Sequence, residues 1–149
     1  MKHLWLYTGI LVSLFLLVIV SLGGAVWGAE QTIGHWTGNL LQGVCHQMPQ
    51  RSFSINGVQM AVNTRCFGIF SGLLAGWLLI PLLIKVRPGK NWTLHFLLVT
   101  VMFQIIDFAG NLMEIWTNTN SSRFLTGILL GFAVSLVISE LFKQKNLEL

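Results

Sequence analysis

The sequence predicts an all-α membrane protein with four transmembrane helices and a long ordered loop, facing outward, between helices 1 and 2. First, only 9% of the 149 residues are charged and 54% are hydrophobic, whereas soluble domains carry about 25% charged residues. Second, four apolar segments, at 4–26, 66–84, 92–112 and 124–142, each approach the ~20 residues that cross a bilayer. Third, these runs are continuously apolar, which favours helices over a membrane barrel. Residues 1–149 are therefore expected to form a single transmembrane domain.

The connection between the first two segments, residues 28–65, is long for so small a protein. A connection of this length is either functional or disordered, and this one holds too many apolar residues for disorder. We expect a short helix along the membrane surface within residues 32–44. The Asn56-Gly57 pair predicts a small β-hairpin.

Lysine and arginine positions predict the orientation, because cytoplasmic ends carry more of them. One set of ends carries Lys2, Lys85, Arg87, Lys90, Lys143 and Lys145, and the other carries Arg51, Arg65 and Arg123. We therefore predict an inner (plasma) membrane location with both termini cytoplasmic and the loop 28–65 extracytoplasmic. The net charge of +4 is small and sits at helix ends, which indicates contact with the lipid bilayer and gives no sign of nucleic-acid binding.

The third segment contains a carboxylate, Asp107, and ionisable groups inside a membrane are costly and functional by default. Glu114 follows seven residues later, which would place it on nearly the same helix face. Arg65 and Arg123 enter the membrane at the same outer level. Two interpretations stay open: an Asp107–arginine ion pair that only joins helices, or a polar pocket. In the second, a polar or anionic ligand such as a lipid headgroup would be bound by Arg51, Arg65, Asp107, Glu114 and Arg123.

Both cysteines, Cys45 and Cys66, fall on the predicted outer, oxidising side. A disulfide between them would close a 21-residue span and contribute about 3 kcal/mol. Alternatively, Cys45, His46, Cys66 and His35 could ligate zinc or copper, although the spacing matches no standard zinc pattern. Free or redox-active thiols are the third interpretation. No hydrolase or phosphate-loop motif is present in the sequence, so catalysis stays undecided.

The second and fourth segments open alike, each with an arginine followed by a Gly-x-x-x-Gly step: Arg65 precedes Gly68 and Gly72, and Arg123 precedes Gly127 and Gly131. Glycine stripes let helices approach closely in membranes. The pattern predicts close helix packing here and suggests that helical hairpins 1–2 and 3–4 are parallel repeats.

These blocks together resemble an uncharacterised prokaryotic family of small multi-pass membrane proteins, known as a domain of unknown function. The blocks are Cys-His-Gln-x-Pro-x-Arg-Ser-Phe from Cys45, Arg-Cys-x-Gly-Ile-x-x-Gly from Arg65, the membrane Asp107, and Asn-Ser-x-Arg-x-x-x-Gly from Asn120. The resemblance covers roughly residues 44–131 and implies no activity. It also implies a third cysteine where this chain has Asn63, which weakens a four-ligand metal centre here.

Two functions of different classes follow. The first is a small membrane protein with an extracytoplasmic polar site that binds a metal ion or a polar or anionic small ligand. The second is a structural or accessory subunit of a larger membrane complex, in which the Cys-His loop is only a disulfide-stapled element. A transporter would require the chain to assemble as a homo-oligomer, because four short helices enclose little volume.

Overall fold

The computed structural model describes residues 4–28, 32–83 and 91–144, with side chains for all of these except 32–35, 83 and 141–144. Four of its helices are long and apolar enough to cross a membrane: α1 (Leu4–Leu22), α4 (Thr64–Leu83), α5 (Trp92–Leu112) and α6 (Asn120–Gln144). The predicted helical class, with four candidate spanning helices, is confirmed.

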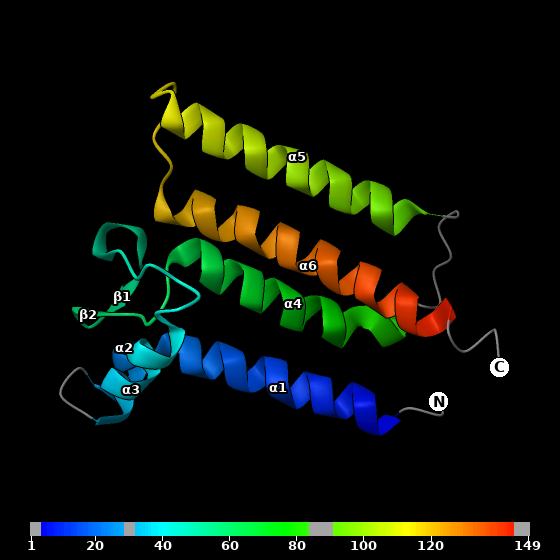
Figure 1. Ribbon diagram of the computed structural model, residues 1–149, viewed down its shortest axis with the longest axis horizontal. Coiled ribbons are helices and arrows are strands. Elements are labelled where there is room, and N and C mark those ends of the chain that lie inside the picture. The colour runs from blue at the N-terminus through cyan, green and yellow to red at the C-terminus, as the bar shows by residue number, and fades with distance from the viewer. Residues whose placement is uncertain (1–3, 29–31, 84–90, 145–149) are drawn as a thin grey trace.

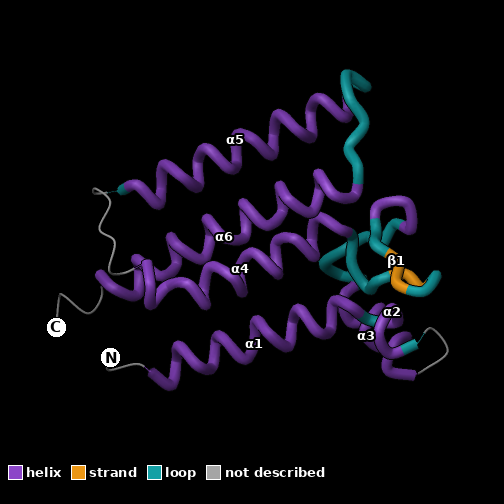
Figure 2. Tube along the Cα trace, turned by 180° about the vertical axis from the view of Figure 1, so that it is seen from behind, coloured by secondary structure: helices purple, strands orange, loops and turns teal. Residues whose placement is uncertain are grey.

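The four long helices form a row in the order α1, α4, α6, α5, as Figures 1 and 2 show from opposite sides. Helix α4 packs between α1 and α6, and α5 packs on the other side of α6. Helices α4 and α6 run parallel, and both start at the end of the molecule that carries residues 23–28 and 32–63 (Figure 1). We call this end the loop end. The start of α1 and the last described turn of α6 lie at the opposite end.

Glycines let α4 and α6 approach closely, and their contacts are reciprocal. Gly68 faces the backbone of Phe124 and Gly127, while Gly127 faces the backbone of Arg65 and Ile69. Gly72 and Gly131 repeat the relation one turn further, against Ile128 and Ile69 respectively. Both glycine pairs are 59 residues apart. A methyl group at any of the four would overlap backbone atoms of the other helix, so the predicted glycine packing is present. The origin of the pattern by duplication stays a prediction.

Several helix boundaries differ from the predicted ones. The first helix ends at Leu22 instead of residue 26, because Gly23 adopts φ 54° against the backbone of Ala61. A separate short helix, α2 (Gly24–Trp27), follows. Helices α4 and α6 begin two and four residues earlier than predicted, at Thr64 and Asn120. Arg65 and Arg123 therefore lie within first helical turns.

The described parts of the connection between α1 and α4 pack around a small core. It contains α3 (Thr32–Leu41), a 3-10 turn η1 (Pro49–Arg51), and the strands β1 (Ser54–Ile55) and β2 (Val58–Gln59). The strands pair antiparallel, with Ser54 opposite Gln59, and Asn56 and Gly57 both have positive φ, as a tight hairpin turn requires. The buried core, which packs on α1 and α4, consists of Leu41, Cys45, Ala61 and Val62. This core fixes the connection on the loop end.

Candidate functional site

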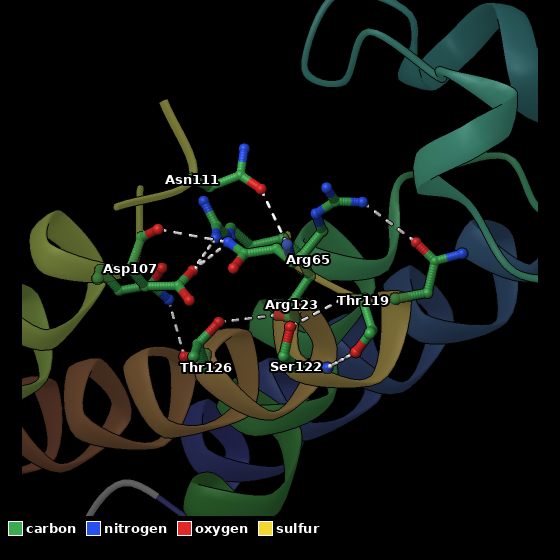
Figure 3. Close-up of polar contacts among 10 residues, drawn as sticks. Arg65, Asp107, Asn111, Thr119, Ser122, Arg123 and Thr126 are labelled. Atoms are coloured by element: carbon green, nitrogen blue, oxygen red, sulfur yellow. Dashed lines mark hydrogen bonds and ion pairs between the residues drawn. The ribbon is translucent and has the colours of Figure 1, made fainter. Parts of the chain in front are cut away.

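The predicted ion pair is present: an Arg65 Nη2 atom contacts an oxygen of the Asp107 carboxylate. The pair joins α4 to α5 (Figure 3), although α6 lies between these helices in the row (Figure 1). The Asn118 side chain donates a second hydrogen bond to the same carboxylate oxygen at 2.8 Å. The Asn118 amide donates to Asn111 Oδ1 at 2.9 Å. The side chains of Arg65 and Asp107 are only 27% and 13% exposed, so the pair is partly withdrawn from solvent.

Arg123 extends this pair into a larger positive cluster. Its guanidinium interacts electrostatically with Arg51, Arg65 and Asp107, and donates to Asn120 Oδ1 at 3.4 Å. We call Arg51, Arg65 and Arg123 the arginine cluster. Its members come from three segments far apart in sequence: η1, the first turn of α4 and the first turn of α6. The reciprocal glycine packing brings the last two together.

Three phenylalanines hold these segments against one another. Phe124 stacks on Phe67 with 5.6 Å between ring centroids, and meets Phe53 edge-on at 5.7 Å. Each ring follows one arginine of the cluster by one or two residues. These rings were not predicted from the sequence, and the phenylalanine that follows each arginine closely was the signal that could have found them.

An amide network joins the connection to α6 and positions Arg51. Asn120 Nδ2 donates to the carbonyl oxygen of Ser52 at 3.2 Å, directly after Arg51. The Ser52 hydroxyl donates to Asn63 Oδ1 at 3.1 Å and accepts from Gln59 Nε2 at 3.2 Å. Asn63 thus engages the connection through its side chain. These polar contacts were also missed, because amides that bond to backbone carry no sequence pattern.

The thiols of Cys45 and Cys66 lie close enough to interact electrostatically, and both are free in this structure. Cys45 is buried, and its sulfur accepts a hydrogen bond from the Asn63 amide at 3.1 Å. His46, in contrast, is exposed. The side chain of His35 lies outside the described set. Among the described side chains, no three His, Cys, Asp or Glu residues are grouped as metal ligands. The predicted Cys45, His46 and Cys66 set therefore does not come together there.

Glu114 does not share the helix face of Asp107. Helix α5 ends at Leu112, and Glu114 is exposed with φ 57°. The helix stops because the chain folds back: the Ile115 amide donates to the Gly110 carbonyl at 2.9 Å, and the Trp116 ring lies against Gly110. A side chain at position 110 would block this fold-back. The expectation of a continuing helical face was therefore wrong.

Comparison with known proteins gives a family but no activity. A model of predicted membrane proteins (DUF2085) matches residues 45–137, a stretch that includes both cysteines, the arginine cluster and Asp107. An uncharacterized protein of Methanocaldococcus jannaschii is 38% identical over 66% of this chain. The match spans 64% of that relative's length.

An uncharacterized protein of Methanothermobacter thermautotrophicus is 32% identical, over 68% of this chain and 88% of its own length. No solved structure matches. Because the family model covers more than half of the residues, the chain belongs to the DUF2085 family of predicted membrane proteins.

Proposed function

We propose that this small integral membrane protein binds an anionic small ligand at the arginine cluster, on its extracytoplasmic face. The observation that carries the proposal is the gathering of three arginines from three separate segments near one carboxylate: Arg65 pairs with Asp107, and Arg123 interacts with Asp107 and with both other arginines. Like charges repel one another, so gathering them costs free energy that a bound anion would offset. Arginine also suits this role, because its planar fork of donors matches carboxylate and phosphate oxygens.

The burial of the pair supports binding over simple surface charge. Arg65 and Asp107 are mostly withdrawn from solvent, and electrostatic interactions strengthen as the surrounding dielectric falls. The phenylalanines at 53, 67 and 124 fix the backbone beside each arginine. An anion would therefore meet arginines whose backbone positions are already set, which lowers the entropic cost of binding.

The extracytoplasmic location is part of the proposal. It is supported by the excess of lysine and arginine at the opposite ends of the helices. A reporter enzyme that is active only outside the cytoplasm, fused after Leu149, should be inactive. An active fusion would place the arginine cluster on the cytoplasmic side.

We also propose that Cys45 and Cys66 form a disulfide in that compartment. Their adjacency supports it, and thiols facing an oxidising compartment pair readily. The two thiols would lose two protons and two electrons to the thiol-oxidising proteins of the compartment. The number of free thiols and of bound metal ions in the purified protein tests this: no metal and no free thiol supports the disulfide, and stoichiometric metal contradicts it.

The binding proposal is tested by identifying the anions and lipids that stay bound when the protein is extracted from the membrane. The full-length protein is extracted in lipid nanodiscs, and the retained anions and lipids are identified by mass spectrometry. We expect an anionic species with the wild type and its loss in an Arg51→Gln, Arg123→Gln double variant. Arg87→Gln is the matched control, since it removes a positive charge from the connection between α4 and α5.

Equal retention by all of these proteins would contradict the proposal. The polar side chains would then serve to hold the helices together, as the structural-subunit interpretation requires. Thermal unfolding of each variant in detergent shows whether a loss of retention reflects a loss of folded protein.

A further inference from the structure

Two buried donors at the arginine cluster lack a partner within the described part of the chain. They are the Thr64 hydroxyl and the Nε–H group of Arg65. Thr64 is fully buried, at 0% exposure. Buried polar atoms are nearly always hydrogen-bonded in folded proteins, and leaving one unpaired costs about 1–3 kcal/mol. Both atoms belong to the first turn of α4, at the loop end, and both could donate to the oxygens of an anion.

The charges at this place do not balance. Arg123 interacts electrostatically with Arg51, Arg65 and Asp107, and Asp107 forms an ion pair with Arg65. Glu114 also follows α5 at the loop end, but it is exposed and forms no ion pair within the described part of the chain. Glu140 bonds to Thr93 through its side chain, and Thr93 lies in the first turn of α5, at the opposite end. The positive charges of Arg51 and Arg123 therefore lack an ion-pair partner among the described residues, and an anion with two negative charges would balance them.

Two helix dipoles add to this field. Helices α4 and α6, of 20 and 25 residues, are parallel and both begin at the cluster. Each helix N-terminus carries the equivalent of roughly half a positive charge. The side-chain oxygen of Asn63, directly before α4, accepts from Ser52, so it is occupied by the connection. The start of α4 thus combines a dipole, a buried unpartnered hydroxyl and the arginine cluster.

These observations distinguish between classes of anion. A carboxylate brings one charge and two oxygens, whereas a phosphate monoester brings nearly two charges and three terminal oxygens at neutral pH. Arginine pairs with phosphate in a bidentate manner, and hydroxyl and main-chain donors at helix N-termini commonly complete such sites. The donors at the start of α4 and the two unbalanced charges match the second class.

We infer that the ligand of the arginine cluster is a phosphate monoester dianion, carried either by a small soluble molecule or by a lipid headgroup. This inference rests on the proposed anion-binding function and names its ligand class. Arg123 and Arg51 supply charge, Thr64 and Arg65 supply donors, and Asp107 holds Arg65 in place.

The first experiment compares anions on the full-length protein in phosphatidylcholine nanodiscs. Glycerol phosphate, sulfate and acetate are titrated by calorimetry at about pH 5 and about pH 8, which bracket the phosphate pKa of about 6. Glycerol phosphate should bind about tenfold more tightly at the higher pH, because its dianion fraction rises by that factor. Sulfate keeps its charge over this range, so any change in sulfate binding between the two pH values measures the contribution of the protein's own groups and is subtracted.

The second experiment removes individual donors. Arg123→Gln should weaken glycerol phosphate binding by at least about tenfold. Thr64→Val, which keeps the side-chain shape, should weaken it by about threefold. Arg87→Gln should leave it unchanged. If Arg123→Gln unfolds, Arg123→Lys keeps the charge and loses the fork, and should still weaken binding.

The third experiment identifies the source of the phosphate. Nanodiscs that contain phosphatidic acid, a lipid phosphate monoester, are compared with nanodiscs that contain phosphatidylglycerol, a diester with one charge. Retention of phosphatidic acid that glycerol phosphate cannot displace indicates a lipid ligand. Displacement by glycerol phosphate indicates a soluble one.

The outcomes separate the two claims. Acetate binding as tightly as glycerol phosphate, with the same loss in Arg123→Gln, would overturn the phosphate inference and leave anion binding standing. No binding of any of these anions or lipids would overturn both.

Discussion

The two helical hairpins of this protein share a backbone arrangement and differ in their chemistry. Each has an outer helix, α1 or α5, packed on a central one, α4 or α6, and the central helices meet through matching glycines. The contacts of the outer helices differ. Tyr7 of α1 bonds to Trp77 through two 3.1 Å hydrogen bonds and a stacked ring contact. Helix α5 instead presents Asp107 to an arginine of the other hairpin.

The connections within the hairpins differ as well. Residues 23–28 and 32–63 pack around a small core, which brings Arg51 and Cys45 to the loop end. Residues 113–119 form a short turn, from which Asn118 reaches Asp107. A nearly symmetric arrangement of helices therefore carries an asymmetric site. The backbone contacts are repeated, while the single carboxylate comes from one half and the third arginine from the other.

Breaking the link between the long connection and its hairpin should have the largest effect. With the disulfide formed, Cys45→Ser should lower the free energy of unfolding by about 3 kcal/mol, because the closed chain loses less entropy on folding. Chemical denaturation in detergent, with and without reductant, measures it. Reductant should affect the wild type and not the variant. Two free thiols and no effect of reductant on the wild type would contradict the disulfide.

Disturbing the shared frame should have the next largest effect. Gly72→Ala should lower the free energy of unfolding by about 2 kcal/mol, because the added methyl group would overlap the backbone of Ile128. Gly131→Ala should cost a similar amount if the halves are equivalent, since it meets Ile69 in the same way. Gly9→Ala is the control, with open space around it and a gain in helix propensity of up to about 1 kcal/mol. A large difference between the two central variants would disprove the equivalence of the halves.

Uncoupling the two halves at the ion pair should have the smallest effect on stability. A double-mutant cycle with Arg65→Gln and Asp107→Asn should give a coupling of about 1 kcal/mol, as expected for a partly exposed pair. Thermal unfolding of the four proteins supplies the values. If the ion pair is purely structural, Asp107→Asn should leave anion retention unchanged. If the pair positions Arg65, retention should fall while the protein stays folded.

Much of the frame was predictable from local patterns. The four apolar runs fixed the number of spanning helices, Asn56-Gly57 fixed the hairpin, and the glycine spacing indicated which helix faces meet. Each of these signals depends on residues close together in sequence. The pairing of Asp107 with an arginine was also expected, because membrane charges need partners. The sequence did not indicate whether Asp107 would contact Arg65 or Arg123, since both arginines were expected at the same level of the membrane.

The site depended on longer-range contacts. Glu114 was assigned to the wrong environment because a tryptophan six residues after Gly110 folds back and ends α5. The phenylalanine contacts join residues as far apart as 53 and 124, a separation over which spacing carries no information. The metal interpretation stays a prediction, since the side chain of His35 lies outside the described residues; of its other ligands, Cys45 is buried while the adjacent His46 is exposed.

The sequence by itself determined that this chain is a membrane protein of four helices with its polar chemistry gathered in few places. This follows because hydrocarbon solvent imposes a length and a polarity that every spanning helix must satisfy locally. The tertiary structure alone decided which contacts form at the loop end, where Arg65 pairs with Asp107 and Arg123 interacts with Arg51, Arg65 and Asp107. That outcome depends on shape complementarity between distant segments, which no local pattern encodes.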